Sequence, residues 1–474
     1  MPYNPRQTKI VCTIGPATAS PEKIRALIKA GMNVARLNFS HGDHEGHGKV
    51  LKSLREISRE SGKEIGVLQD LGGPKIRLGE LPVPERLLEP GERVVLRAMS
   101  LKDPFDIPVN YPYLVEDLSV GDRILLADGH VLLKAKAKAA DHILCEVLVG
   151  GLFDSHKGVN LPSTPLRVPA FMEKDRKDLA FGLEAGVDFV ALSFVRHEKD
   201  LEPVQEMLLN ADPRPLLIAK IEKPQAIDRL EEILAQVDGV MVARGDLGVE
   251  MPLEEVPLIQ KRIIRMSRAA GKPVITATQM LRSMIESPRP TRAEAADVAN
   301  AILDGTDALM LSDETAIGGY PVTAVSILDR IARATERHLH EGGFFSEIIS
   351  KTLPMTASAI GRSACFLAED LQATAIVAAT SSGSTARMVA QFRPKCPVLG
   401  LTPNRHTERQ LTLSWGVQPA RVAPFTDTDE IFDLAQSWAM ENNIAGAGDR
   451  LVVTAGTPVG TPGTTNLIKV MEIE

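Results

Sequence analysis

The chain has 474 residues, a length that predicts about three domains at roughly 150 residues each. Hydrophobic residues make up 44% of the chain and charged residues 24%, which excludes disordered and fibrous proteins. The formal net charge of -7 argues against a nucleic-acid partner, because neutralising phosphates requires a basic surface.

Neither the start of the chain nor its cysteines indicate export. Prolines interrupt the first residues where a signal peptide needs an apolar run, and no segment approaches the ~20 apolar residues of a membrane helix. Cys12, Cys145, Cys365 and Cys396 lie too far apart in sequence to indicate a zinc knuckle or a disulfide framework. We therefore expect a soluble, cytoplasmic protein that does not contact membranes.

Short apolar segments that resemble strands alternate with longer helical patterns. The first helical pattern is bracketed by Ser20 as N-cap, Pro21 in the first turn and Gly31 at the end, and another covers 223–239. Eight such βα units predict a closed (β/α)8 barrel, with a doubly wound open sheet as the alternative. The predicted strands are 9–15, 33–40, 65–72, 189–195, 216–222, 239–245, 273–279 and 308–314.

About a hundred residues separate the third predicted strand from the helix at 173–186 that precedes the fourth. Short strand-like runs at 93–97, 123–127 and 142–149 fill this gap, which predicts an insertion. Beyond about residue 352 helices alternate with strands at 374–380, 397–402 and 450–454. The predicted fold is an α/β protein: a TIM barrel (1–73 and 169–345) with an inserted small all-β barrel domain (74–168) and a C-terminal α/β domain (346–474).

Polar residues gather where the predicted barrel strands end, the position of active sites in such barrels. Because side chains alternate along a strand, Arg36, Asn38 and Ser40 should share one face. Three polar side chains in line inside a barrel would be costly without a ligand, although a layer of mutually satisfied polar groups is the alternative.

The fifth and sixth strands carry a charged pair each. Lys220 and Glu222 should point the same way, as should Arg244 and Asp246. A plain buried ion pair is one interpretation, but two carboxylates on adjacent strands also suit a magnesium ion. Lys220 would then lie where an ammonium neutralises a transferring phosphoryl group or a developing enolate.

Other strand ends and one later loop could bind anions. Gly245 and Asp246 open a turn whose backbone amides suit a carboxylate or phosphate, and Thr278 and Ser312 end the last two strands. His41 is the one histidine near a strand end, whereas His44 and His47 are expected on an exposed helix face. A hydroxyl-rich turn between a strand and a helix is an anion site or a solvated loop, and it comprises Thr380, Ser381, Ser382, Gly383, Ser384 and Thr385.

Several of these segments resemble the pyruvate kinase family, and the resemblance covers nearly the whole chain. They are 9–17, 35–42, 219–222, 241–248, 277–281 and 288–294, and the order of barrel, β insertion and C-terminal α/β unit agrees as well. The resemblance implies phosphoryl transfer from phosphoenolpyruvate to ADP, with protonation of the enolate to pyruvate and release of ATP.

The resemblance also implies roles for individual residues. Glu222 and Asp246 would bind magnesium or manganese, and Lys220 would stabilise the phosphoryl group and the enolate. Gly245, Asp246 and Thr278 would hold the substrate carboxylate, and Thr278 and Ser312 would serve the proton route. Arg36 would contact the substrate phosphate, and the nucleotide phosphates would meet Asn38, Ser40, His41, Arg77 and Lys174.

Two departures from the family pattern bear on cations. Lys75 stands where members that need potassium carry a glutamate, so we expect activity without potassium. Leu71 stands where those members typically carry a threonine. Asn38, Ser40 and Asp70 still match potassium ligands, which keeps a monovalent-cation site at these residues and Leu71 as an alternative. Asp313 replaces a usual glycine, which affects local detail rather than the reaction.

The resemblance further implies a phosphorylated effector at the 380–385 loop and a homotetramer. Two rival functions remain. A metal-dependent lyase of oxoacids would use the carboxylate pair without needing Lys220 beside Glu222, and a non-catalytic protein would have lost Lys220, Glu222, Asp246 or Thr278.

Overall fold

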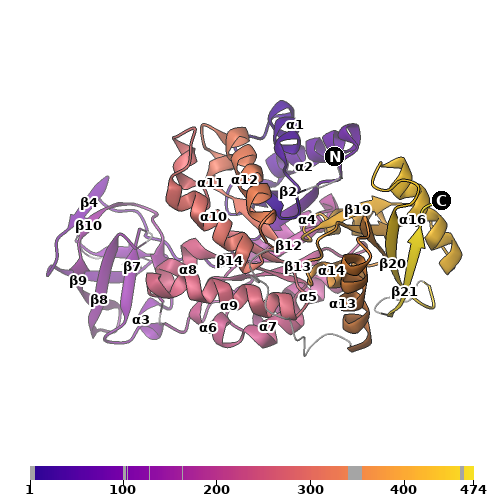
Figure 1. The fold of residues 1–474 in the computed structure, drawn as a ribbon. Coiled ribbons are helices and arrows are strands. Elements are labelled where there is room, and N and C mark those ends of the chain that lie inside the picture. Colours follow the sequence, from indigo (N-terminus) through magenta and orange to yellow (C-terminus); the bar gives the residue numbers. More distant parts are fainter. Residues whose placement is uncertain are drawn as a thin grey trace.

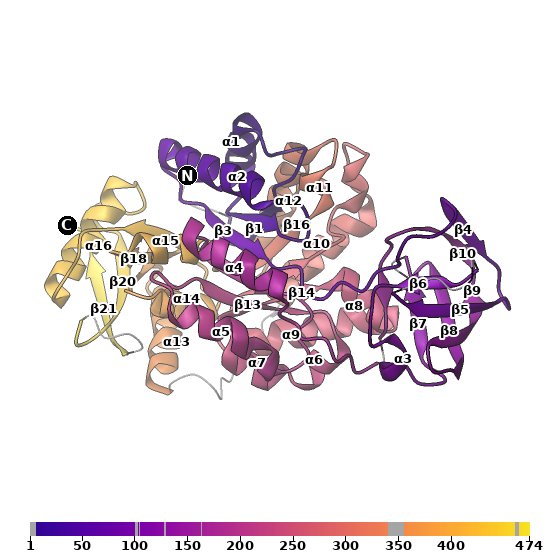
Figure 2. The ribbon, with the colours of Figure 1, turned by 180° about the vertical axis from the view of Figure 1, so that it is seen from behind.

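The computed structural model describes residues 6–99, 103, 105–127, 129–162, 164–339, 355–459 and 464–474. Three units follow one another along the molecule (Figure 1): a set of β strands at one end, a barrel in the middle and a second α/β unit at the other end. The view from behind agrees (Figure 2). The predicted boundary at 345/346 lies outside the described residues.

The central unit is a closed barrel of eight parallel strands in the order β1-β16-β15-β14-β13-β12-β3-β2. All eight predicted strands are confirmed, each ending earlier than expected, and closure rules out the open doubly wound sheet. The strands are β1 Lys9–Thr13, β2 Val34–Asn38, β3 Gly66–Asp70, β12 Phe189–Leu192, β13 Leu216–Ile221, β14 Gly239–Ala243, β15 Val274–Ala277 and β16 Ala308–Leu311.

Alternation along the strands divides the barrel into an inner and an outer core. Leu216 and Ile218 of β13 belong to the inner cluster, whereas Leu217 and Ala219 pack with the surrounding helices. Lys220 continues the inward series of β13. In the same way Arg36 and Asn38 follow Val34 in β2, and Asp70 follows Leu68 in β3. Because side chains alternate along a strand, these polar side chains point into the interior at the carboxyl end of the barrel.

Helices surround the barrel, and their ends follow the predicted signals. Ser20 caps α1, accepting a hydrogen bond from the Lys23 amide, and Gly31 ends it at a φ of 126°. The pattern at 223–239 is two helices rather than one, because the chain leaves helical geometry at Arg229. The helices are α1 Pro21–Ala30, α2 His44–Ser61, α4 Glu173–Ala185, α5 Glu202–Leu209, α6 Pro224–Asp228, α7 Leu230–Gln236, α8 Arg244–Glu250, α9 Val256–Ala269, α10 Arg292–Asp304, α11 Asp313–Ala316 and α12 Pro321–Glu336. Short 3-10 turns are η1 Glu198–Leu201, η2 Leu253–Glu255 and η3 Arg282–Ile285. Within the described ranges, no helix combines the length and the apolar character needed to cross a lipid bilayer.

The strands between β3 and α4 form their own hydrophobic core. They make a six-stranded sheet, β11-β7-β8-β9-β5-β6, and a two-stranded sheet, β10-β4, so the predicted all-β insertion is confirmed. The chain enters this unit through Gly73 at a φ of 62°, where a Cβ atom would lie 2.8 Å from the Phe194 ring. The elements are β4 Glu85–Leu88, β5 Arg93–Ala98, β6 Ile107–Val109, α3 Leu114–Asp117, β7 Arg123–Leu126, β8 Val131–Lys138, β9 His142–Val149, β10 Gly151–Asp154 and β11 Val159–Asn160.

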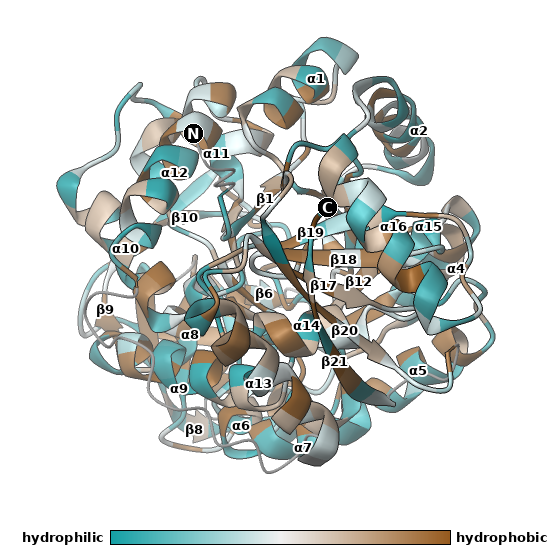
Figure 3. Ribbon diagram, turned by 45° about the vertical axis from the view of Figure 1, so that its right-hand side comes forward, coloured by the Kyte–Doolittle hydropathy of each residue, from teal (hydrophilic) through white to brown (hydrophobic). Residues whose placement is uncertain are grey.

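The C-terminal unit is a five-stranded sheet in the order β19-β18-β17-β20-β21, with only β21 antiparallel to its neighbour. Its inner strands are fully buried, and Figure 3 shows apolar colouring along β17 and β18. The elements are α13 Met355–Asp370, β17 Ala375–Ala379, α14 Ser384–Ala390, β18 Val398–Thr402, α15 Arg405–Leu411, β19 Val417–Arg421, α16 Thr428–Glu441, β20 Arg450–Gly456 and β21 Thr465–Glu472.

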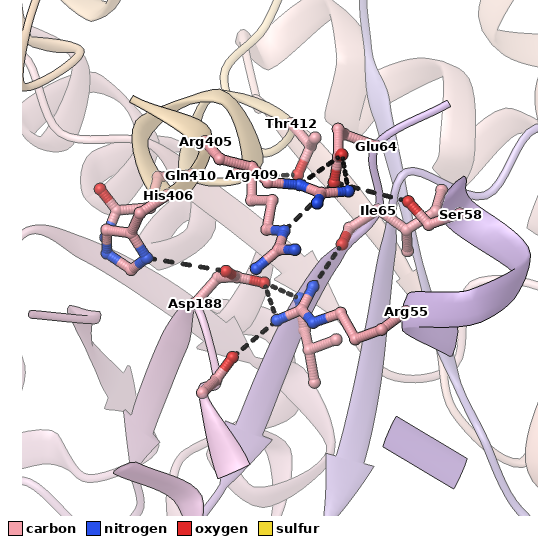
Figure 4. A network of polar contacts seen from close by, with 12 residues as sticks. Arg55, Ser58, Glu64, Ile65, Asp188, Arg405, His406, Arg409, Gln410 and Thr412 are labelled. Carbon is pink, nitrogen blue, oxygen red and sulfur yellow. Dashed lines mark hydrogen bonds and ion pairs between the residues drawn. The ribbon is translucent and has the colours of Figure 1, made fainter. Parts of the chain in front are cut away.

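A polar network joins α15 of the C-terminal unit to the barrel (Figure 4). Glu64 accepts hydrogen bonds from Arg405 Nη2 at 2.8 Å and Arg409 Nε at 3.1 Å. Burial would raise the pKa of Glu64, but these two guanidinium groups outweigh it and lower the pKa. Nearby, fully buried Asp188 accepts from Arg55 Nη2 at 2.8 Å. Charge-assisted hydrogen bonds between α15 and Glu64 thus join the C-terminal unit to the barrel.

Replacing Glu64→Gln should loosen α15 from the barrel, because two arginines lose their carboxylate. We expect a local destabilisation of roughly 1–3 kcal/mol, seen as faster amide hydrogen exchange across α15. The matched control is Glu60→Gln, which removes an exposed pair with Arg25 and should leave α15 unchanged.

The pH dependence provides a second check. Since the folded pKa of Glu64 is lowered, its contribution is present above the unfolded pKa and is lost as the pH falls through the folded pKa. Equal exchange in wild type and Glu64→Gln at neutral pH would contradict the role of this network.

Candidate active site

The inward-facing charges at the barrel mouth form one network. Arg36 Nε and Nη2 each lie 2.7 Å from Asp70 Oδ2, and Arg36 Nη1 lies 2.9 Å from Thr13 Oγ1. Strand register brings them together, since β2 pairs with β3 and with β1. Burial would raise the pKa of Asp70, but Lys220 and Arg36 lower it, so the carboxylate remains charged.

Lys220 is the second cation of this network and is only 9% exposed. Its Nζ lies 2.8 Å from Glu222 Oε1, 3.3 Å from Asp70 Oδ1 and 2.7 Å from Ser193 Oγ. Burial would lower the pKa of Lys220, yet the carboxylates of Asp70, Glu222 and Asp246 more than compensate and raise it. The ammonium is therefore permanently charged and held in place by three oxygen atoms.

Glu222 and Asp246 form the carboxylate pair expected from the sequence. Glu222 is 1% exposed, and its Oε2 accepts a hydrogen bond from the Phe194 amide at 2.9 Å. Burial raises the pKa of Glu222; Lys220 opposes this shift and the negative charge of Asp246 adds to it, so a cation between the two carboxylates would favour their charged forms. Hard oxygen donors in this arrangement fit a magnesium ion, although no group of three or more potential protein ligands occurs in the described part of the chain.

The segment after β14 differs from the prediction. Arg244 and Asp246 do not continue the strand but start α8, so their side chains do not share a strand face. Arg244 instead binds Asp297 through Nη1 at 2.7 Å and donates from Nη2 to the Thr278 carbonyl at 2.7 Å. The Gly245 amide donates to Thr278 Oγ1 at 2.7 Å. The first turn of α8 and the end of β15 therefore form one unit.

Backbone geometry distinguishes Thr278 and Ser312. Thr278 has a φ of 67°, a left-handed conformation that is costly for a β-branched residue and typical of functional sites. Ser312 precedes α11, and its amide donates to Glu314 Oε2 at 2.8 Å. Asp313 is exposed at the start of α11, so it does not enter the barrel interior.

The residues expected to bind nucleotide phosphates lie at the end of β2 and across the mouth. Asn38 Oδ1 accepts from the Ser40 amide at 3.2 Å, so these two share a turn rather than a strand face. Lys174 Nζ donates to the Phe39 carbonyl at 2.7 Å and pairs with Asp178. Burial, followed by the charges of Lys75, Arg77 and Arg36, lowers the pKa of His41, which indicates a cationic environment.

A cavity of about 420 Å³ lies between the barrel mouth and the inserted β unit. Lys75, Arg77, Lys157, Lys223 and Asp246 are among its lining residues. A cavity of this volume suits a ligand of nucleotide size, and four cationic side chains on its wall suit an anionic one.

Lys75 lines the cavity at the barrel mouth. Burial lowers its pKa, as do Arg77 and Lys220, while Asp70 and Asp246 oppose the shift, so the Lys75 ammonium lies within reach of all four charges. The Leu71 carbonyl accepts a hydrogen bond from Ser193 Oγ at 2.7 Å.

The 380–385 loop lies far along the chain in the C-terminal unit. Thr380 Oγ1 accepts from the Gly383 amide at 2.9 Å, and Ser382 Oγ and Ser384 Oγ lie 3.1 Å apart. The N-cap of α14 is Gly383, at a φ of 81°, rather than a serine. A small cavity of about 30 Å³ is lined by Thr380, Ser381, Ser382, Ser384 and Thr385.

Sequence analysis missed three supporting groups. Thr13 and Ser193 bind the site cations Arg36 and Lys220, and only their position at a strand end could have indicated them. The third is an inserted-unit contact: Glu250 Oε1 accepts from Lys223 Nζ at 2.6 Å and from Asn160 Nδ2 at 3.1 Å. No sequence motif indicates that pairing.

Comparisons with known proteins agree in their result. The model of the pyruvate kinase barrel domain matches residues 5–325, and that of the pyruvate kinase alpha/beta domain matches residues 358–471. The pyruvate kinase of Geobacillus stearothermophilus is 48% identical over 98% of this chain and 80% of its own length. That of Clostridium acetobutylicum is 42% identical over 99% of this chain and 100% of its own length.

A solved structure gives the same relationship. The crystal structure of a pyruvate kinase from Cryptosporidium parvum superposes with a TM-score of 0.90 at 34% identity, covering 99% of this chain and 96% of that one. Together with the charged network at the barrel mouth, these matches show that the chain belongs to the pyruvate kinase family.

Proposed function

We propose that this chain transfers the phosphoryl group of phosphoenolpyruvate to ADP, giving pyruvate and ATP, with magnesium or manganese as the divalent cofactor. One observation carries the proposal: Lys220 and Arg36 are held by Asp70 and Glu222 at the barrel mouth, beside the 420 Å³ cavity. Phosphoryl transfer depends chiefly on positioning and charge neutralisation, which this network supplies.

Glu222 and Asp246 would hold the divalent metal. When bound, the metal supplies Lewis-acid stabilisation of the charge on the phosphoryl and enolate oxygens. Lys220 would neutralise the negative charge of the transferring phosphoryl group beside this metal, because three oxygen atoms already orient its ammonium. Arg36, fixed on Asp70, would contact the substrate phosphate.

The Thr278 region would position the carboxylate of the substrate. Amides at Gly245 and Asp246 lie in the first turn of α8, and Thr278 Oγ1 is bonded to the Gly245 amide. Thr278 and Ser312 would belong to the route by which a solvent proton reaches the enolate carbon after the phosphoryl group has left. The strained φ of Thr278 supports such a role.

Asn38, Ser40, His41, Arg77 and Lys174 would bind the nucleotide phosphates, and the inserted unit (74–168) would act as a lid. The Asn160 contact with Glu250 links that unit to the barrel in the present arrangement. A lid excludes water from the transferring group and so favours ADP over hydrolysis.

Lys75 would take the place of a monovalent cation. Its ammonium interacts favourably with the carboxylates of Asp70 and Asp246, the negative charges that a bound potassium ion would also neutralise. The alternative is that Asn38, Ser40, Asp70 and the Leu71 carbonyl still hold potassium.

Regulation and assembly follow the family resemblance. The 380–385 loop (Thr380, Ser381, Ser382, Gly383, Ser384, Thr385) would bind a phosphorylated effector, supported by its hydroxyls and the adjoining cavity. We also propose a homotetramer in a cytoplasmic location. The proposed domains are the barrel (1–73 and 169–345), the inserted unit (74–168) and the C-terminal unit (346–474).

The first test is pyruvate formation from phosphoenolpyruvate, ADP and magnesium in buffer free of sodium and potassium, repeated after adding potassium. Activity before the addition is the expected result, since Lys75 supplies the fixed charge. Activity only afterwards would retain the kinase and reject the Lys75 assignment. No activity in either buffer, with phosphorylated sugars supplied, would favour a lyase of oxoacids instead.

Substituting Lys220→Met should lower kcat by a factor on the order of 10³, because the transition-state charge loses its partner. Magnesium binding, measured by calorimetry, should be nearly unchanged since Glu222 and Asp246 remain. Lys199→Met, at an exposed site in η1, is the matched control and should retain full activity. Near-normal turnover of Lys220→Met would reject the assigned role.

Substituting Lys75→Glu should make activity depend on added potassium, because a carboxylate replaces the built-in cation. The measurement is kcat against potassium concentration, with Lys75→Gln as a neutral comparison that shows a smaller dependence. A Lys75→Glu enzyme that is inactive at every potassium concentration, or as active as wild type without it, would contradict charge replacement.

A further inference from the structure

A second cationic cavity lies between the barrel and the C-terminal unit. It is formed by residues that precede β15 and β16 and by residues in and after α14, at the end of the barrel opposite the proposed active site. Its volume is about 10 Å³, which accommodates one water molecule or one oxygen atom of a larger group. It opens beside Lys272 and Arg387, both of which are partly exposed.

The lining carries an excess of positive charge. Arg268, Lys272, Arg387 and Arg393 contribute four cations, and Asp307 is the one acidic residue among the described residues that line it. Both oxygens of Asp307 are occupied, Oδ1 by Arg393 Nη1 at 3.1 Å and Oδ2 by the Val274 amide at 3.0 Å. Burial, followed by the charge of Arg393, lowers the pKa of Arg268 to about 9. Four cations against one acidic residue give this lining a net positive charge, which favours an anion.

Several polar groups in this lining have no partner in the described part of the chain. Gln391 is 3% exposed, and neither its Oε1 nor its Nε2 is hydrogen-bonded. Ser414 is 2% exposed, and its Oγ is likewise unbonded. Arg387 Nη1 and Arg393 Nε complete the set. Because buried polar groups are almost always bonded, four such residues around one cavity indicate that a polar molecule occupies it.

The donors define the chemistry of this ligand. Two guanidinium groups, an ammonium, a side-chain amide and a hydroxyl belong to residues that line a space of about the size of one oxygen atom. We propose that this cavity binds a phosphate group, with one oxygen inside and the remaining oxygens against Lys272 and Arg387. The shared chemistry is the phosphate dianion, either free or as the monoester of a small organic molecule.

The site is separate from the 380–385 loop but linked to it. Arg387 Nη2 donates to the Ser382 carbonyl at 3.0 Å, so the same side chain touches the loop and lines the cavity. On the other side, β15 and β16 run from this cavity to Thr278 and Ser312. A phosphate bound here would therefore share Arg387 with the loop and would lie at the start of two strands that end at the proposed active site.

The test is equilibrium dialysis of the full chain with labelled inorganic phosphate. Wild type should bind phosphate at this cavity. Lys272→Gln and Gln391→Leu should each raise the Kd of this site about tenfold or more, because each substitution removes a donor to the anion. Gln391→Leu should fold as well as wild type, since it removes an unbonded buried amide. Arg265→Gln, on the exposed face of α9, removes the same charge and should bind normally.

Two further experiments distinguish this cavity from the 380–385 loop, and free phosphate from a phosphate monoester. Ser384→Asp places a negative charge in the 380–385 loop and should leave this site intact. Displacement of the label by glycerol phosphate would identify a monoester as an acceptable ligand, whereas displacement by inorganic oxyanions alone would identify the free ion. Unchanged phosphate binding in both Lys272→Gln and Gln391→Leu would overturn the proposal and leave the cavity to water.

Discussion

The barrel mouth depends on the sharing of Asp70 between two cations. Arg36 uses Oδ2 of this carboxylate, and Lys220 approaches Oδ1 while also binding Glu222. All these groups are largely removed from water, so each charge is stable only because the others are present. The network also explains how charged side chains can lie inside the barrel. Apolar side chains fill most of its interior, and at the carboxyl ends of the strands the ion pairs provide the interactions that water would otherwise provide. Removing one member would leave its partners buried and uncompensated.

Much of this arrangement follows from sequence period alone. The eight barrel strands, their closure and the inward direction of Lys220, Arg36 and Asp70 could be predicted because side-chain alternation and the number of βα units leave few solutions. The shared direction of Lys220 and Glu222 was predicted on the same basis, and their ion pair was the alternative interpretation of it. Family resemblance added the identity of the reaction, which periodicity could not supply.

The failures have equally physical causes. Arg244 and Asp246 were expected on a strand, but β14 ends at Ala243, two residues before the predicted end, and α8 begins at Arg244. The inserted unit was predicted to be all-β, but its strand order was not predicted, because long-range antiparallel pairing decides which strands join, as in the pairing of β10 with β4. Thr13 and Ser193 are short hydroxyl side chains with no distinguishing pattern, so their contacts with Arg36 and Lys220 depend on distances that only the fold determines.

The shared carboxylate has a consequence for how ligands arrive. Arg36 and Lys220 contribute two positive charges and Asp70 and Glu222 two negative charges, so this cluster is electrically balanced before any ligand binds. A balanced cluster exerts little long-range attraction, and encounter with a charged ligand then depends weakly on ionic strength. The cationic wall of the neighbouring cavity, with Lys75, Arg77 and Lys157, is the part that attracts anions from a distance. The residues that attract the ligand and the residues proposed to act on it thus lie on different sides of the same opening. Added salt should therefore lower the association rate of the ligand far more than it lowers kcat.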